Sequence, residues 1–112
     1  METHGLNHIH LHVRDLEKSL RFYGAFGFQK VADHEDMSFL VRPGFSDVIT
    51  LRVSGMHGVD HYGFMLKDAT RLDAAIAELE RNGGRLIERT TLGPLNTPSA
   101  FLTDPDGYHV QI

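Results

Sequence analysis

The chain contains an internal repeat, and this repeat is the feature that most restricts its fold. Residues 5–15 align with residues 58–68 at a constant offset of 53, and the apolar positions of one copy are apolar in the other. Three residues are identical in the two copies, namely Gly5/Gly58, His8/His61 and Asp15/Asp68. A repeat of this length predicts two copies of one supersecondary unit, and two copies favour a paired, pseudo-symmetric fold over a solenoid.

The first segment of each copy is predicted to be a half-buried strand. Residues 7–14 alternate between apolar and polar side chains, with Ile9 and Leu11 on one face and three histidines on the other. A period of two residues is typical of a strand with one face against the core. The three histidines on the polar face are His8, His10 and His12.

A helix is predicted after each of these strands. Asp15 is a good N-cap for the first helix, and Thr70 with Asp73 resembles a capping box for the second. Two apolar stripes compete on the first helix, one formed by Leu16, Leu20 and Tyr23 and one by Ser19, Phe22 and Phe26. We expect Tyr23, Phe22 and Phe26 to lie in the core.

Three short strands are predicted behind each helix. They cover about residues 28–34, 37–42 and 47–53 in the first copy and 85–91, 99–103 and 108–112 in the second, with a turn at Asp104–Gly107. The prediction is an α+β fold of two β-α-β-β-β modules in tandem, which form a cup-shaped mixed sheet with helices on its outer face. Residues 1–112 form a single domain, with module one at 1–54 and module two at 58–112.

Composition excludes several classes of protein. The absence of cysteine removes disulfides, thiolate metal sites and cysteine nucleophiles. The net charge of −4, without a cluster of Lys or Arg, argues against nucleic acid and anionic membranes as partners. No apolar run approaches a membrane span and the N-terminus does not resemble a secretory signal, so we expect a cytoplasmic protein.

Eight histidines in 112 residues are unusual, and most of them share one predicted sheet face. The face opposite the helices carries the histidines of the first strand together with Val48, Thr50, Arg52, His61, Gly63, Met65, His109 and Gln111. An open, solvated sheet face usually favours Lys, Glu and Thr instead. If the two sheets pack side by side, the histidines line a shared cup.

The chain resembles the vicinal oxygen chelate superfamily, which includes glyoxalase I, extradiol dioxygenases, fosfomycin-resistance enzymes, methylmalonyl-CoA epimerase and bleomycin-binding proteins. The resemblance rests on the motifs at Leu6–Tyr23, Gly27–Phe28 and Asp104–Tyr108, and it extends over nearly the whole chain. It is specific for the superfamily and weak for any one activity, because the fold serves several chemistries.

The resemblance implies a divalent metal ion, Fe, Mn, Ni or Zn, held by His8, His61 and Gln111. Thr50 falls at the last-strand position of module one, where glyoxalase I has a carboxylate, so a true glyoxalase I is disfavoured. Metal enzymes of the superfamily usually have Glu where this chain has Gln111. An amide oxygen can ligate a metal but brings no charge, so metal affinity should fall and the demand for an anionic substrate should rise.

Less specific interpretations remain open for these residues. His8 and His61 could be polar caps of equivalent turns, and Gln111 could be an inert surface amide. His10, His12 and His109 could line a polar cavity or act as catalytic acid–base groups, since an imidazole titrates near neutral pH.

The expected function is that of a small metal-dependent enzyme, extradiol dioxygenase-like, that acts on a small-molecule substrate such as a vicinal diol or hydroxy-carbonyl compound. The alternatives are a metal-free protein that sequesters an antibiotic or other small molecule, and a metal-dependent isomerase or lyase. We expect a homodimer, in which the two modules of one site come from one chain or are exchanged between chains.

Overall fold

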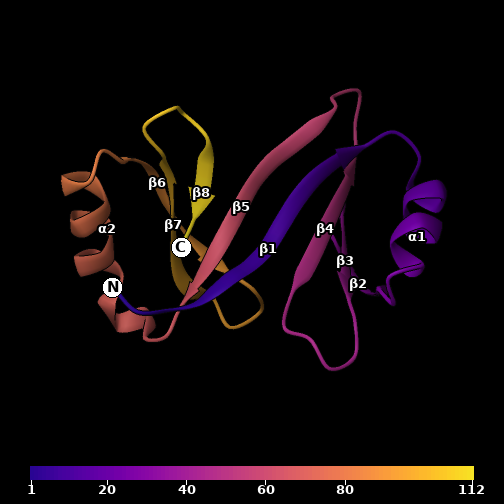
Figure 1. The fold of residues 1–112 in the computed structure, drawn as a ribbon, viewed down its shortest axis with the longest axis horizontal. Coiled ribbons are helices and arrows are strands. Elements are labelled where there is room, and N and C mark those ends of the chain that lie inside the picture. The colour runs from indigo at the N-terminus through magenta and orange to yellow at the C-terminus, as the bar shows by residue number, and fades with distance from the viewer. The chain divides into compact units, whose positions relative to one another are not determined.

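The computed structural model describes all of residues 1–112 and confirms the predicted order of elements (Figure 1). The first half contains β1 (Thr3–Val13), α1 (Leu16–Gly24), β2 (Gln29–His34), β3 (Met37–Val41) and β4 (Val48–Val53). The second half contains β5 (Gly58–Leu66), a 3-10 turn (Ala69–Arg71), α2 (Leu72–Arg81), β6 (Arg85–Leu92), β7 (Thr97–Thr103) and β8 (His109–Gln111). The fold is therefore α+β, with β-α-β-β-β occurring twice.

The chain divides into two compact units whose boundaries cut through the two repeated strands. One unit is Asn7–Asp60, and the other combines Met1–Leu6 with His61–Ile112. The repeated strands β1 and β5 therefore each contribute residues to both units. Neither α1 nor α2 is long and apolar enough to cross a membrane.

In the unit Asn7–Asp60 the strands are ordered β2-β3-β4-β1, with β1 parallel to β4 and the other neighbours antiparallel. Asp15 caps α1 as predicted, since its side chain accepts a hydrogen bond from the main-chain N–H of Lys18. The helix packs on the sheet face that carries Leu40 and Leu51. The core consists of Phe28, Leu40 and Leu51, with Leu11, Val13, Leu16, Leu20, Tyr23 and Ile49 packed against it.

This core selects one of the two stripes predicted for α1. Tyr23 packs against the core as expected. The expectation was wrong for Phe22 and Phe26, whose exposed fractions are 61% and 59%. Their rings contact each other on the outer side of the unit, with centroids 5.8 Å apart. A helix of nine residues has room for one apolar stripe against the sheet, and the other stripe remains in solvent.

In the second unit the strands are ordered β5-β8-β7-β6, with β5 parallel to β8 and the other neighbours antiparallel. Helix α2 covers one face, where Leu72, Ala75, Ile76, Ala100, Leu102 and Ile112 form the core. The predicted capping box of Thr70 and Asp73 was wrong. Asp68 instead accepts hydrogen bonds from the main-chain N–H and the hydroxyl of Thr70, and a 3-10 turn precedes α2.

Candidate functional site

The strand registers place equivalent residues of the two modules on the faces away from the helices. In module one, His10 lies opposite Thr50 on the parallel pair β1 and β4. In module two, Gly63 lies opposite Gln111 on the parallel pair β5 and β8. Since the repeat aligns His10 with Gly63, Thr50 and Gln111 occupy equivalent positions. A phenylalanine lies across from each of them on the next strand, Phe39 and Phe101 respectively.

His8 is half-buried on β1, and its Nδ1 atom lies 3.0 Å from the side-chain oxygen of Asn7. An amide oxygen only accepts hydrogen bonds, so Nδ1 carries a ring proton in this contact. A hydrogen bond of this kind fixes the tautomer and the ring orientation of a metal-binding imidazole. The Asn7 contact therefore orients the His8 ring on β1.

His10 and His12 follow on the same face of β1, with ring centroids 6.0 Å apart. His10 is 1% exposed, and its Nδ1 atom is hydrogen-bonded to the hydroxyl of Thr50 across the parallel ladder. The hydrogen bond between His10 and Thr50 depends on the register of β1 against β4. This register could not be predicted from the sequence.

His12 contacts one residue just after β4, Ser54, and one residue in β5, Asp60. Its Nε2 atom lies 2.9 Å from a carboxylate oxygen of Asp60, and its Nδ1 atom lies 3.0 Å from the hydroxyl oxygen of Ser54. Since a carboxylate only accepts, Nε2 carries a proton in the contact with Asp60. The same Ser54 oxygen accepts the main-chain N–H of Met56 at 3.0 Å. His12 therefore has defined partners at both ring nitrogens.

In the second unit, His61 and Gln111 both lie near Phe101. The His61 ring packs edge-on against the Phe101 ring, with centroids 4.9 Å apart and an interplanar angle of 86°. Gln111 is 5% exposed and pairs with Phe101 across the antiparallel ladder. Its Nε2 atom donates to the hydroxyl of Ser99 at 3.0 Å. His109 lies two residues earlier on the same face of β8 and is exposed.

The predicted metal ligands are thus distributed between the units, with His8 in one and His61 with Gln111 in the other. No group of three or more His, Cys, Asp or Glu side chains gathers in a metal-binding arrangement. The donor set still suits a divalent ion, because two neutral imidazoles and an amide oxygen are accepted by Fe, Mn, Ni and Zn. The Gln111 amide supports this fit, since its nitrogen is held by Ser99 and its oxygen is therefore the atom directed elsewhere.

Sequence reasoning missed four polar partners of the predicted site residues: Asn7, Ser54, Asp60 and Ser99. Ser99 carried the clearest signal, because it alternates with Phe101 along β7 and so shares the face of Gln111. The other three lie next to a strand end or a repeated histidine. They became visible only from the side-chain geometry.

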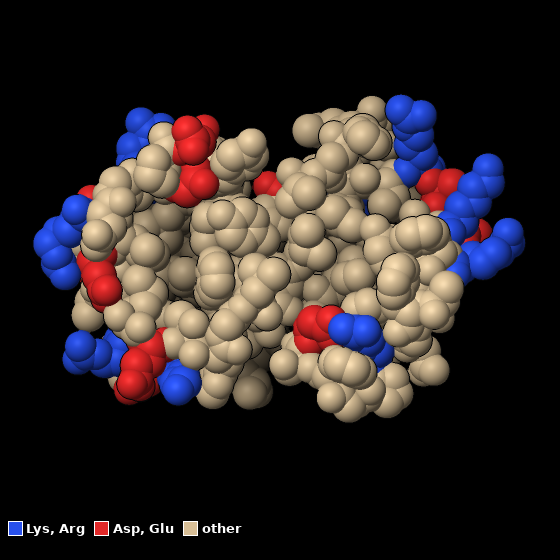
Figure 2. Space-filling model, viewed as in Figure 1, with Lys and Arg blue, Asp and Glu red and all other residues tan.

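Charged side chains near the site are paired within their own unit. On the face drawn in Figure 2, the Lys, Arg, Asp and Glu side chains of each unit lie mainly toward its helix. Arg42 holds Asp47 through two hydrogen bonds of 3.1 and 2.7 Å, and this contact lowers the pKa of Asp47. Arg52, which shares the histidine face of module one, lies 3.1 Å from a carboxylate oxygen of Asp36. The charge of Arg52 is therefore paired with a carboxylate of its own unit.

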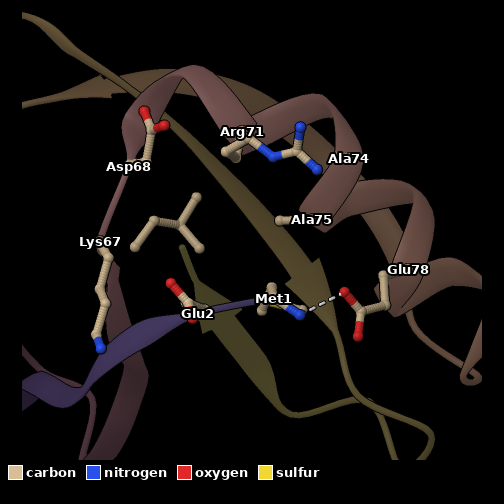
Figure 3. Close-up of a pocket in the computed structure, with 9 residues that line it drawn as sticks. Met1, Glu2, Lys67, Asp68, Arg71, Ala74, Ala75 and Glu78 are labelled. Carbon is tan, nitrogen blue, oxygen red and sulfur yellow. Dashed lines mark hydrogen bonds and ion pairs between the residues drawn. The ribbon is translucent and has the colours of Figure 1, made fainter.

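A cavity of about 390 Å³ lies elsewhere in the second unit, between α2 and the N-terminal strand (Figure 3). None of the predicted site residues lines it. The amino group of Met1 lies 2.7 Å from the Glu78 carboxylate at its edge and lowers the pKa of that carboxyl. Its lining mixes acidic and basic side chains, including Glu2, Lys67 and Arg71. This balance gives the cavity no clear preference for an anion or a cation.

The chain belongs to the Glyoxalase/Bleomycin resistance protein/Dioxygenase superfamily, which it matches over residues 5–112. This match confirms the resemblance to the vicinal oxygen chelate proteins. The fold and the two histidine-bearing repeated strands agree with it.

Solved structures show the same fold. A Mn(II)-bound glyoxalase from Novosphingobium aromaticivorans superposes with a TM-score of 0.82 at 19% identity, over 97% of this chain and 38% of that one. A 2,3-dioxygenase from Pseudomonas sp. KL28 gives 0.78 at 19% identity, over 97% of this chain and 40% of that one. Methylmalonyl-CoA epimerase from Mycobacterium tuberculosis superposes with a TM-score of 0.73 at 23% identity, over 97% of this chain and 86% of that one. The chain therefore spans about two fifths of the glyoxalase and dioxygenase chains.

Proposed function

We propose that the protein is a divalent-metal-dependent enzyme that acts on a small molecule with two adjacent oxygen donors, such as a vicinal diol or a hydroxy-carbonyl compound. The metal ligands in this proposal are His8, His61 and Gln111. The observation that carries it is the buried Gln111 amide, whose nitrogen is engaged by Ser99 so that its oxygen is left as the donor. The superfamily neighbours include a Mn(II)-bound glyoxalase and extradiol dioxygenases, which supports a metal.

When bound, the metal would supply Lewis acidity toward the two substrate oxygens. The chain's own contribution is a set of neutral ligands, which leaves the positive charge of the ion uncompensated. A substrate that binds as an anion, such as a catecholate, is favoured by such a site. Because the site favours an anionic chelating substrate, we propose an extradiol dioxygenase-like reaction.

Proton transfer in this proposal is assigned to the three other histidines predicted for the site, His10, His12 and His109. His10 and His12 share the β1 face with His8, and His109 shares the β8 face with Gln111. His12 has the arrangement of an oriented base, because the Asp60 carboxylate holds its Nε2 proton and Nδ1 lies 3.0 Å from the Ser54 hydroxyl oxygen. It would accept a substrate hydroxyl proton at Nδ1 after Ser54 turns away.

A second candidate is a metal-free protein that sequesters a small molecule. The neutral Gln111 at the position where metal enzymes of the superfamily usually have Glu favours it, because an amide brings no charge to a metal. In that case the histidine faces bind an aromatic or acidic compound by stacking and hydrogen bonding. Metal-free protein would then bind the compound as tightly as metal-loaded protein.

Metal binding is the decisive test. Protein stripped with a chelator and reloaded separately with Mn²⁺, Fe²⁺, Ni²⁺ or Zn²⁺ should hold about one ion per chain, as one three-ligand site requires. His8→Ala and His61→Ala should each abolish retention, measured by elemental analysis and calorimetry. His34→Ala is the matched control, because that imidazole is 71% exposed and lies outside the proposed ligand set.

Retention of the ion by the double variant His8→Ala/His61→Ala would show that metal binds elsewhere on this histidine-rich chain, and the enzyme proposal would lose its basis. Binding of 4-nitrocatechol is the second readout, since its absorbance changes on ionisation. It should bind the loaded protein and bind the stripped protein far more weakly. Light scattering of the same samples tests the proposed homodimer.

A further inference from the structure

Ser99 is a deeply buried polar side chain on the strand next to Gln111, with 1% of its surface exposed. Its hydroxyl donates to the main-chain oxygen of Ile112 at 2.7 Å. That oxygen is fixed by the sheet, because it also accepts the main-chain N–H of Ala100 at 3.0 Å and the Ile112 N–H returns a 2.9 Å bond. Ser99 therefore has a stationary acceptor for its single proton.

This arrangement determines which way the Gln111 amide points. A hydroxyl has one proton, and Ser99 gives it to Ile112, so toward Gln111 it can only accept. The group that lies 3.0 Å from the Ser99 oxygen must then be the NH₂ of Gln111. A flipped amide would place two acceptor oxygens against each other in a buried site, which is costly. Oε1 is consequently directed away from Ser99.

Module one has no such arrangement at the equivalent place. Two residues before Phe39 it has Met37, whereas two residues before Phe101 module two has Ser99. Met37 has no hydroxyl, and Thr50, the equivalent of Gln111, bonds to His10 on the neighbouring strand β1 instead. The pairing of a serine with a glutamine is therefore a feature of module two alone and does not follow from the duplicated scaffold.

We propose that Ser99 is a positioning residue that presents the Gln111 side-chain oxygen as a metal ligand and makes position 111 selective for an amide over a carboxylate. This inference rests on the proposed metal function. A glutamate at 111 has no proton to offer at neutral pH, so Ser99 would have to leave Ile112 or face an acceptor. A carboxylate also needs no orientation, since either of its oxygens can face the metal.

The first test needs no metal. In the stripped wild-type protein, the Gln111 side-chain NH₂, identified by its disappearance in Gln111→Glu, should show one proton that exchanges slowly with solvent. Ser99→Ala should speed that exchange by about tenfold, the effect of losing one buried hydrogen bond. Ser99→Thr keeps the hydroxyl and should restore the protection. Unchanged exchange in Ser99→Ala would overturn the proposed positioning.

The second test is metal affinity measured by calorimetry in two backgrounds. With Gln at 111, Ser99→Ala should weaken binding by about ten- to a hundredfold, as loss of a group that orients a ligand does. With Glu at 111, the same Ser99→Ala change should leave affinity nearly unaltered. Ser38→Ala is the matched control, because Ser38 is also buried and bonds Asp33 in module one.

The outcomes separate the two proposals. An equal loss of affinity in both backgrounds would mean that Ser99 supports the fold and does not act through the amide, which overturns this inference. Metal affinity could be unchanged in His8→Ala and His61→Ala while Ser99→Ala still speeds exchange of the Gln111 NH₂ protons. That result would mean that Ser99 positions the amide as described but that the proposed metal function is wrong. Ligand presentation would then be refuted together with that function.

Discussion

Replacement of Gln111 by Glu is the most informative single change in this protein. The two side chains have nearly the same size, so the variant exchanges an amide NH₂ for a charged oxygen at a position that is 5% exposed. The amide donor to Ser99 is lost, so the Ser99 hydroxyl must either leave Ile112 or face an acceptor. The variant therefore changes charge and hydrogen bonding while packing is retained.

The metal-free variant should be less stable. Loss of the Gln111–Ser99 hydrogen bond costs about 1 kcal/mol, and burial of an imperfectly satisfied charged group costs a further ~1–3 kcal/mol. A total of about 2–4 kcal/mol is large against the ~5–15 kcal/mol of a typical domain but should leave the protein folded. Metal binding should improve by about 1–3 kcal/mol, or roughly 5- to 150-fold, because the ligand now carries a charge.

The loss of stability should depend on pH with a defined sign. Burial raises the pKa of a carboxyl, so the folded pKa of the introduced glutamate lies above its unfolded value of about 4.3. Below that unfolded value the side chain is protonated in both states, and its O–H can donate to Ser99 as the amide does. The destabilisation should therefore be absent in acid, grow as pH rises through about 4.3, and be complete above the folded pKa.

Urea unfolding of the stripped proteins across pH, followed by calorimetry with the preferred metal, measures both effects. Gln29→Glu is a matched control, since Gln29 is the only other glutamine and lies exposed on β2. An anionic chelator should bind the loaded Gln111→Glu protein more weakly than the wild type. Unchanged metal affinity would remove Gln111 from the ligand set, and an unchanged stability at neutral pH would contradict the buried contact to Ser99.

Two further predictions concern the unit Asn7–Asp60. Leu40→Ala, at 0% exposure, should lower the free energy of unfolding by about 2–5 kcal/mol, whereas Phe22→Ala at 61% exposure should change it by less than about 0.5 kcal/mol; equal losses in urea titrations would contradict the core described above. Arg42 lowers the pKa of Asp47 below its unfolded value, so the pair stabilises the fold above about pH 4 and this contribution is lost as pH falls through the folded pKa. The stability difference between wild type and Asp47→Asn should accordingly shrink in acid, and a difference that is constant with pH would refute the ion pair's role.

The sequence by itself determined the order of elements and the superfamily. The repeat at offset 53 predicted two β-α-β-β-β modules, and the alternation in residues 7–14 predicted a strand that the structure extends to Thr3–Val13. Asp15 was correctly identified as a cap, since capping depends on local chain geometry. The assignment of His8, His61 and Gln111 as ligands came from the resemblance and stays a prediction.

Tertiary structure decided what local patterns left open. Both stripes of α1 have helical spacing, and only packing against Leu40 and Leu51 shows that Tyr23 faces the core while Phe22 does not. Asp68, and not Thr70, begins the second helical segment because the chain turns through a 3-10 turn first.

The contacts around the proposed ligands depended on tertiary structure most of all. Parity along a strand predicts which face a side chain occupies, so the sequence could place Gln111 on the histidine face. The register between β7 and β8 sets which side chains meet across the ladder, and it arises from long-range pairing of residues far apart in the chain. The contact of Gln111 with Ser99, which orients the amide, could therefore be known only once the strands were paired.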